Sequence, residues 1–146
     1  MAFNVAVLPE PTSDLIAALE AVGLPMDDVY EPGRRFYRFE DDAGLIGYGG
    51  LEHAGPAILI RSITVIDGRR NAGLGAEILS WLEAEAARLQ ATGLYLLTTS
   101  ATAFFQRHGY AALPRSAAPP AIAASRQFST LCPASASFMF KELRPQ

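Results

Sequence analysis

The feature that most constrains the fold is a glycine-containing turn that joins an apolar run to an amphipathic one. Residues 57–66 are almost wholly apolar, which is typical of a strand buried on both faces of a sheet. After the turn at 67–75, apolar residues recur at helical spacing, at Leu74, Ile78, Leu82 and Leu89. A short apolar run at 94–98 follows that helix. The three runs predict a strand–helix–strand unit, in which the strands lie parallel and the crossover is right-handed.

The rest of the chain adds strands and shorter helices around that unit. Alternating or β-rich runs predict strands over 3–8, 36–40, 45–53 and 135–143. Capping residues and helical spacing predict helices from a cap at 12–14 to Val22, over 101–108 and over 121–131. In the helix that starts at Leu74, we expect the charged residues on the solvent side: Glu77, Glu83, Glu85 and Arg88. These elements predict one α+β domain over residues 1–146, with a single sheet and helices on both faces.

The composition restricts the class of function. With 146 residues, of which 50% are apolar, the chain is long enough for a hydrophobic core. A formal net charge of -3 argues against nonspecific nucleic-acid binding, which needs an excess of Lys and Arg. Cys132 is the single cysteine, so neither an intramolecular disulfide nor a cysteine-based metal site is expected. No apolar run approaches the roughly 20 residues that span a bilayer, and no secretory signal begins the sequence, so we expect a soluble, cytoplasmic protein.

The turn before the long helix has the properties of an anion site. Backbone N–H groups at a helix start have no intrahelical partner and carry the positive end of the helix dipole. Gly73 and Gly75 remove the side chains that would keep a phosphate from these amides. Ala76 and Glu77 follow, so the lysine of a nucleotide-binding P-loop is missing. Ile78 occupies the place of the third glycine in the dinucleotide fingerprint, which excludes that motif as well.

Three segments resemble motifs of one family, the GNAT N-acetyltransferases. The run Arg70-Asn71-Ala72-Gly73-Leu74-Gly75 matches the family's R/Q-x-x-G-x-G/A signature at every defined position. Ile63-Thr64-Val65 resembles the family's fourth strand, and residues 104–110 resemble its F-Y-x-x-x-G-F helix. The resemblance covers about the whole chain. It implies the acyl-CoA N-acyltransferase fold, a twisted and mostly antiparallel sheet in which the parallel fourth and fifth strands splay apart.

This resemblance implies acetyl-coenzyme A (acetyl-CoA) as the cosubstrate, without a metal, and a small-molecule amine as the acceptor that attacks the thioester. Main-chain amides of the turn would hold the pyrophosphate, and the fourth strand would pair with the pantetheine arm like an added strand. A backbone N–H on that strand, such as that of Ile63, would polarise the thioester carbonyl. The residues implied in cofactor binding are Ile63, Thr64, Val65, Arg70, Asn71, Ala72, Gly73, Leu74, Gly75 and Ala76.

The chain departs from the family at the group that protonates the leaving thiolate. The family's tyrosine is replaced by Phe105, which has no proton to give. Candidate substitutes are the hydroxyls of Thr98, Thr99, Ser100 and Tyr110. A hydroxyl before a helix can equally cap that helix. The candidate catalytic residues are Arg61, Thr98 and Ser100.

Arg61 lies on an otherwise apolar strand, where an unpaired charge is costly. Two interpretations stay open: Arg61 binds an oxyanion of the acceptor in the substrate cleft, or it forms a salt bridge with Glu52 on the neighbouring strand. The base that takes the proton of the amine is also open, and its candidates are Glu52, His53 and Tyr48.

A narrower resemblance is to GNAT proteins associated with arsenic-resistance operons, and it is carried by residues 59–65, 94–99 and 126–136. It implies an amino-acid-like acceptor bearing arsenic or phosphorus, with a carboxylate and an oxyanion that Arg61 or Arg126 could meet. The alternatives are protein or peptide N-acetylation, an acyl-CoA-binding module that has lost its chemistry, and a structural protein that binds no cofactor. A homodimer through the first or last strand also stays open, because core packing explains their apolar residues equally well.

Overall fold

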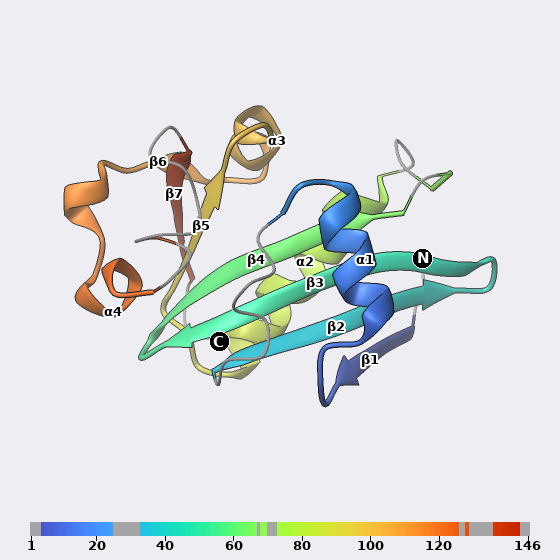
Figure 1. Cartoon of the computed structure of the whole chain (residues 1–146). Coiled ribbons are helices and arrows are strands. Elements are labelled where there is room, and N and C mark those ends of the chain that lie inside the picture. The colour runs from blue at the N-terminus through green and yellow to red at the C-terminus, as the bar shows by residue number, and fades with distance from the viewer. Residues whose placement is uncertain are drawn as a thin grey trace.

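The computed structural model describes residues 4–24, 33–66, 68–69, 73–125, 128 and 136–143, without the side chain of Ala54. In this part of the chain, one sheet has the strand order β1-β2-β3-β4-β5-β7-β6 (Figure 1). Its strands are β1 Asn4–Leu8, β2 Arg34–Asp41, β3 Gly44–Ala54, β4 Ala57–Val65, β5 Gly93–Thr98, β6 Ala111–Ala112 and β7 Ser137–Glu142. Neighbouring strands pair antiparallel except β4 and β5, which are parallel. The predicted α+β class and the parallel pair are therefore confirmed.

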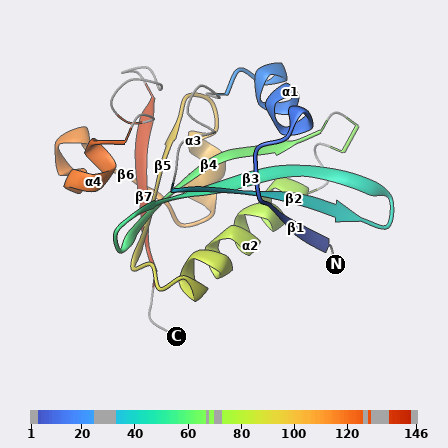
Figure 2. The ribbon, with the colours of Figure 1, turned by 60° about the horizontal axis from the view of Figure 1, so that its bottom comes forward.

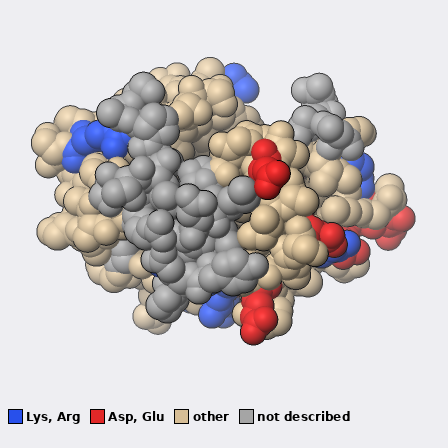
Figure 3. Space-filling view, in the orientation of Figure 1, with Lys and Arg blue, Asp and Glu red and all other residues tan. Residues whose placement is uncertain are grey.

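Helices cover both faces of the sheet, as predicted. They are α1 Ser13–Ala21, α2 Leu74–Arg88, α3 Thr102–Arg107 and α4 Pro120–Ala123, with a short 3₁₀ helix, η1, at Arg115–Ala117. Figure 2 shows α1 on one side of the sheet and α2 on the other. Thr12 caps α1, because its hydroxyl accepts a 3.2 Å hydrogen bond from the N–H of Leu15. Figure 3 shows Lys and Arg side chains in separate small groups on the face that carries α1, without a continuous basic surface there.

The long helix α2 packs closely on β3. Its apolar side chains at Ile78 and Leu82 are fully buried against the sheet. A Cβ placed on Gly49 of β3 would lie 2.8 Å from Cδ1 of Leu82, so a glycine is required where helix and strand touch. One expectation about α2 was wrong: Glu85 is only 8% exposed rather than on the solvent side. It is buried because Tyr37 and Arg88 both donate hydrogen bonds to its carboxylate.

The parallel strands β4 and β5 separate soon after they begin. Their pairing extends only from Ala57–Leu59 to the facing 93–95 segment, and Figure 1 shows the two strands diverging toward α3. On its other edge, β4 carries a bulge: Thr64 pairs with Tyr48 and Arg61 with Gly50, so two residues of β4 face one residue of β3. Ser62, in that bulge, has a φ of 63°, an uncommon left-handed conformation for a residue with a side chain.

The helix predicted over 121–131 is confirmed only in part within the described residues: it is interrupted at Ala124 and Ser125, and Phe128 is again helical. The structure has α4 from Pro120 to Ala123, and Ala124 and Ser125 already lie outside it. The hydroxyl of Ser125 donates to the carbonyl of Ile122 at 2.7 Å and accepts from the N–H of Phe128 at 3.3 Å. A side chain that bonds its own backbone in this way competes with helix continuation. Residues 126–127 and 129–131 lie outside the described residues.

The strand order shows which of the two strands considered for a homodimer, the first and the last, lies at an edge of the sheet. β7 is not an edge strand, because β5 pairs with one side of it and β6 with the other. Phe138 of β7 is 3% exposed, so it belongs to the core. β1, by contrast, pairs with β2 and stands at the end of the strand order. In the described residues, no helix is both long and apolar enough to cross a bilayer.

Candidate active site

A cavity of about 350 Å³ occupies the wedge where β4 and β5 part. The wedge exists because the two strands stop pairing after three residues, which leaves one edge of β4 facing open space. Its lining is mainly apolar. The lining residues are Val22, Leu24, Ile60, Arg61, Ser62, Ile63, Thr64, Val65, Leu96, Leu97, Thr98, Ser100, Ala101, Phe104 and Phe105.

A second cavity, of about 480 Å³, adjoins the first at the start of α2. Val65 and Phe104 line both cavities, so the two lie next to each other between the end of β4 and the helix start. The other residues that line the second cavity are Arg69, Gly73, Leu74, Gly75, Ala76 and Arg107. An extended ligand with an anionic end would fit this shape.

The start of α2 presents bare backbone to the second cavity. Gly73, the N-cap residue, has a φ of 76° and offers no side chain to the first amides of the helix. A Cβ on Gly73 would meet no atom within 4 Å, and one on Gly75 would make ordinary van der Waals contact at 3.9 Å with Phe104 and Val65, so neither position is crowded. The amides of Leu74, Gly75 and Ala76 therefore suit an anion. The other predicted members of this turn, Arg70, Asn71 and Ala72, lie outside the described residues.

Sequence reasoning missed two arginines that line the second cavity. Arg69 donates a 2.9 Å hydrogen bond to the carboxylate of Asp41, and this bond is the main reason that the pKa of Asp41 is lowered. Arg107 is exposed and lies on α3, three residues after Phe104. That spacing puts both side chains on one face of a helix, a signal that was available in the sequence. Arg107 thus adds a positive charge beside the helix start.

Of the two interpretations of Arg61, the structure contains the ion pair with Glu52. Its Nη1 atom lies 3.1 Å from Oε1 of Glu52, and its side chain is 0% exposed, so the predicted salt bridge is present. Its Nε also donates to the hydroxyl of Ser62 at 3.2 Å. Glu52 also forms a second ion pair, in which its Oε2 atom lies 3.5 Å from Nη2 of Arg34. Arg61 is also one of the residues that line the wedge cavity.

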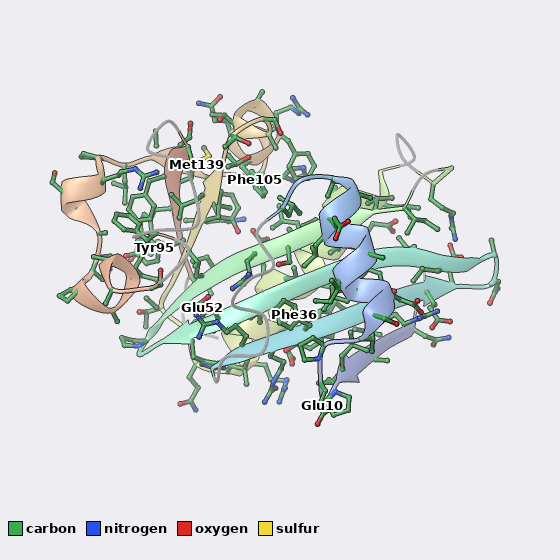
Figure 4. All side chains as sticks on the ribbon, in the orientation of Figure 1. Glu10, Phe36, Glu52, Tyr95, Phe105 and Met139 are labelled. Atoms are coloured by element: carbon green, nitrogen blue, oxygen red, sulfur yellow. The ribbon has the colours of Figure 1, made fainter. Side chains whose placement is uncertain are left out.

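The structure brings some candidate hydroxyls to the wedge and keeps others away. Thr98 and Ser100 line it, and the Thr98 hydroxyl accepts a 3.0 Å hydrogen bond from the N–H of Ala101, as a cap would. Phe105 lines it too, next to β5 at the α3 end of the sheet (Figure 4). Tyr110 is absent from the described lining because its hydroxyl donates instead to Glu83 at 2.8 Å. Burial raises the pKa of Tyr110 far above its ordinary range, so it is a poor proton donor.

The three candidate bases do not line the wedge cavity. Glu52 is held in its ion pairs, toward the end of β3 and β4 that lies away from α3 (Figure 4). Tyr48 is buried in the apolar cluster under α1, where burial raises its pKa. His53 is exposed. In the described residues, no group of His, Cys, Asp or Glu side chains is arranged to hold a metal ion.

Solved structures with this fold come from several bacteria. An N-acetylglutamate synthase from Neisseria gonorrhoeae, complexed with coenzyme A and N-acetyl-glutamate, is 16% identical with a TM-score of 0.74; the match covers 97% of this chain and 35% of the synthase. The chain thus spans about a third of the length of that synthase. A Staphylococcus aureus acetyltransferase of the GNAT family is 18% identical with a TM-score of 0.71, and the match covers 98% of this chain and 100% of that one. A Bacillus subtilis acetyltransferase in complex with CoA is 14% identical with a TM-score of 0.72, and the match again covers 98% of this chain and 100% of the other.

At these identities the structural likeness establishes the fold, and the family is established by the sequence. A comparison with the curated proteins found no match. A family model described as "Acetyltransferase (GNAT) domain" matches residues 32–112. Because that match covers more than half of the sequence, from β2 to β6, the chain belongs to the GNAT acetyltransferase family.

Proposed function

We propose that the chain, as a single domain over residues 1–146, transfers an acetyl group from acetyl-CoA to a primary amine of a small molecule. The observation that carries this proposal is the bare backbone at the start of α2, beside a cavity that shares two lining residues with the wedge. Coenzyme A has a matching shape, a diphosphate followed by an extended arm that ends in the thiol. The gonococcal synthase and the B. subtilis acetyltransferase, which share the fold, were both solved with coenzyme A.

The main-chain groups have separate roles in this proposal. Amides of Leu74, Gly75 and Ala76, together with Asn71 and Ala72 before them, hold the diphosphate. Arg107 lies at the rim of the same cavity and adds charge for a phosphate. The edge of β4 over Ile63–Val65 pairs with the pantetheine arm. Acetyl-CoA supplies an activated acyl group, and the N–H of Ile63, in the bulge, polarises its carbonyl.

The remaining candidates, Thr98, Ser100 and Arg61, act on the acceptor amine and on the leaving thiolate in this proposal. Thr98 and Ser100 line the cavity near Phe105, where the hydroxyls can relay a proton through water. Arg61, held by Glu52, meets an anionic group of the acceptor. An amino acid is such an acceptor, and the gonococcal synthase was solved with N-acetyl-glutamate. The finer proposal, an arsenic- or phosphorus-bearing amino acid, rests on sequence resemblance, and most of its diagnostic segment lies outside the described residues.

The proposal is tested by calorimetry with coenzyme A and by release of free thiol from acetyl-CoA against a panel of amines and amino acids. We expect coenzyme A to bind and at least one amine to accelerate thiol release. Absence of coenzyme A binding would overturn the proposal and leave a structural protein. Binding without acceleration by any amine would favour an acyl-CoA-binding module, the reading that Phe105 supports. Transfer to peptides alone would make the chain a peptide N-acetyltransferase.

The role of Arg61 needs a matched pair of variants. Arg61→Gln and Glu52→Gln each break the same buried ion pair, but only the first removes the cation of a residue that lines the wedge. If Arg61 meets the acceptor, Arg61→Gln raises the KM for the acceptor well above the value in Glu52→Gln. Equal acceptor KM values in the two folded variants would leave Arg61 a structural role only.

A further inference from the structure

Helix α3 lies at the centre of the proposed site but is only six residues long. Phe104 lines both cavities, Phe105 lines the wedge, and Arg107 lines the cavity at the start of α2. Such a short helix has little stability of its own, so its position must be set by tertiary contacts.

Lys141, the only lysine in the sequence, holds the C-terminal end of α3. Its Nζ donates a 3.0 Å hydrogen bond to the carbonyl of His108, the C-cap residue of the helix. The chain then turns through Gly109, whose φ is 93°. A Cβ on Gly109 would lie 3.4 Å from Cε of Lys141, so the lysine side chain passes directly over this turn.

The same ammonium group ties this turn to α2. Lys141 Nζ lies 3.0 Å from Oε2 of Glu83, and the hydroxyl of Tyr110 donates to that same oxygen at 2.8 Å. The Lys141 Nζ atom also lies 5.5 Å from the centroid of the Tyr110 ring. The side chains of Lys141 and Glu83 are 31% and 19% exposed, so solvent screens their attraction only in part. One carboxylate thus joins α2, β7 and the residues that follow α3.

We propose that Lys141, Glu83 and Tyr110 form a clamp that positions α3 for coenzyme A binding. This inference rests on the proposed function. None of the three lines either cavity in the described part of the chain, so they act through α3 as positioning residues. A lysine suits the role because its three donors point in different directions, toward a carbonyl and a carboxylate, whereas the planar guanidinium of arginine presents its donors in one plane.

The test compares two ion pairs whose carboxylates both lie on α2. Lys141→Met keeps the aliphatic length but removes the ammonium. Arg88→Met removes the Arg88–Glu85 pair, which also lies on α2 but touches no residue of α3 among the contacts described for it. We expect Lys141→Met to weaken coenzyme A affinity about threefold to tenfold, measured by calorimetry. Arg88→Met should leave that affinity unchanged, and Lys141→Arg should recover part of the loss.

A second measurement tests the clamp independently of coenzyme A binding. Hydrogen exchange of the backbone amides of Phe105, His108 and Tyr110 should be faster in Lys141→Met and Tyr110→Phe than in Arg88→Met, without coenzyme A present. Equal exchange rates in these variants would overturn the clamp. Equal coenzyme A affinity in Lys141→Met and the unaltered protein would overturn its role in binding. If the unaltered protein binds no coenzyme A, the proposed function fails, whereas the exchange rates still decide whether the clamp holds α3.

Discussion

The hydroxyl of Tyr37 donates a 3.0 Å hydrogen bond to Oε2 of Glu85, which joins β2 to α2 inside the core. Tyr48, on the next strand, is buried to the same degree on the opposite face of the sheet, under α1. Its hydroxyl has no hydrogen-bond partner among the described residues. The two tyrosine side chains are equally buried, but we expect the hydroxyl of Tyr37 to stabilise the fold and the hydroxyl of Tyr48 to destabilise it.

Removing each hydroxyl should separate these contributions. Tyr37→Phe should lower the free energy of unfolding by about 1–2 kcal/mol, because a bond to a carboxylate is lost. Tyr48→Phe should raise it by up to about 1 kcal/mol, because a polar group without a partner leaves the core. Urea denaturation of both variants measures the difference. A larger loss in Tyr48→Phe than in Tyr37→Phe would contradict the assignment of their contacts.

Stability in acid should depend on Glu85. Hydrogen bonds from Arg88 are the main cause that lowers its pKa below the ordinary value of 4.5, and the bond from Tyr37 lowers it further against the effect of burial. A lowered folded pKa means that this contribution is complete above pH 4.5 and is lost as the pH falls through the folded value. In denaturation series from neutral to acidic pH, Glu85→Gln should be less stable at neutral pH and lose less stability below pH 4.5. Parallel curves for the two proteins would show that Glu85 does not carry this dependence.

Gly75→Ala should separate stability from ligand binding. The backbone of Gly75 is helical and a Cβ there would make only ordinary van der Waals contacts, so alanine should preserve or raise stability by up to about 1 kcal/mol. The added methyl enters the cavity at the start of α2, so coenzyme A affinity measured by calorimetry should fall. Gly73→Ala is the contrasting variant: its φ of 76° makes alanine cost about 1 kcal/mol of stability. Unchanged affinity in Gly75→Ala would move the diphosphate site away from this helix start.

Phe105→Tyr restores the hydroxyl that the family pattern has at this position. A coenzyme A thiolate is a tolerable leaving group, because thiols ionise near pH 8.5. We therefore expect kcat to change far less than the roughly 10²- to 10⁴-fold that a general acid typically contributes. Steady-state kinetics with the best acceptor of the panel measures this. A rise of that size would show that proton delivery to the leaving group limits the natural chain.

The sequence by itself determined α2 and β4 and predicted an anion site at the turn between them, because these features are local. Apolar spacing fixed α2, the buried run fixed β4, and glycine chemistry is the basis of the predicted phosphate site at the start of α2. The helix expected over 121–131 is interrupted at Ala124 and Ser125, where the Ser125 side chain competes for the backbone. No periodicity shows that competition.

Tertiary structure alone decided which of the candidate side chains share a site. Tyr110 and Thr98 were both considered as proton donors from the sequence, yet Tyr110 bonds to Glu83 and Thr98 lines the wedge. Likewise, Glu85 is buried because Tyr37, 48 positions away, reaches its carboxylate. Such outcomes depend on which strands and helices meet, and a charge or hydroxyl can be buried only where a distant partner satisfies it. Local pattern specifies elements, whereas long-range packing specifies the environment of each polar group.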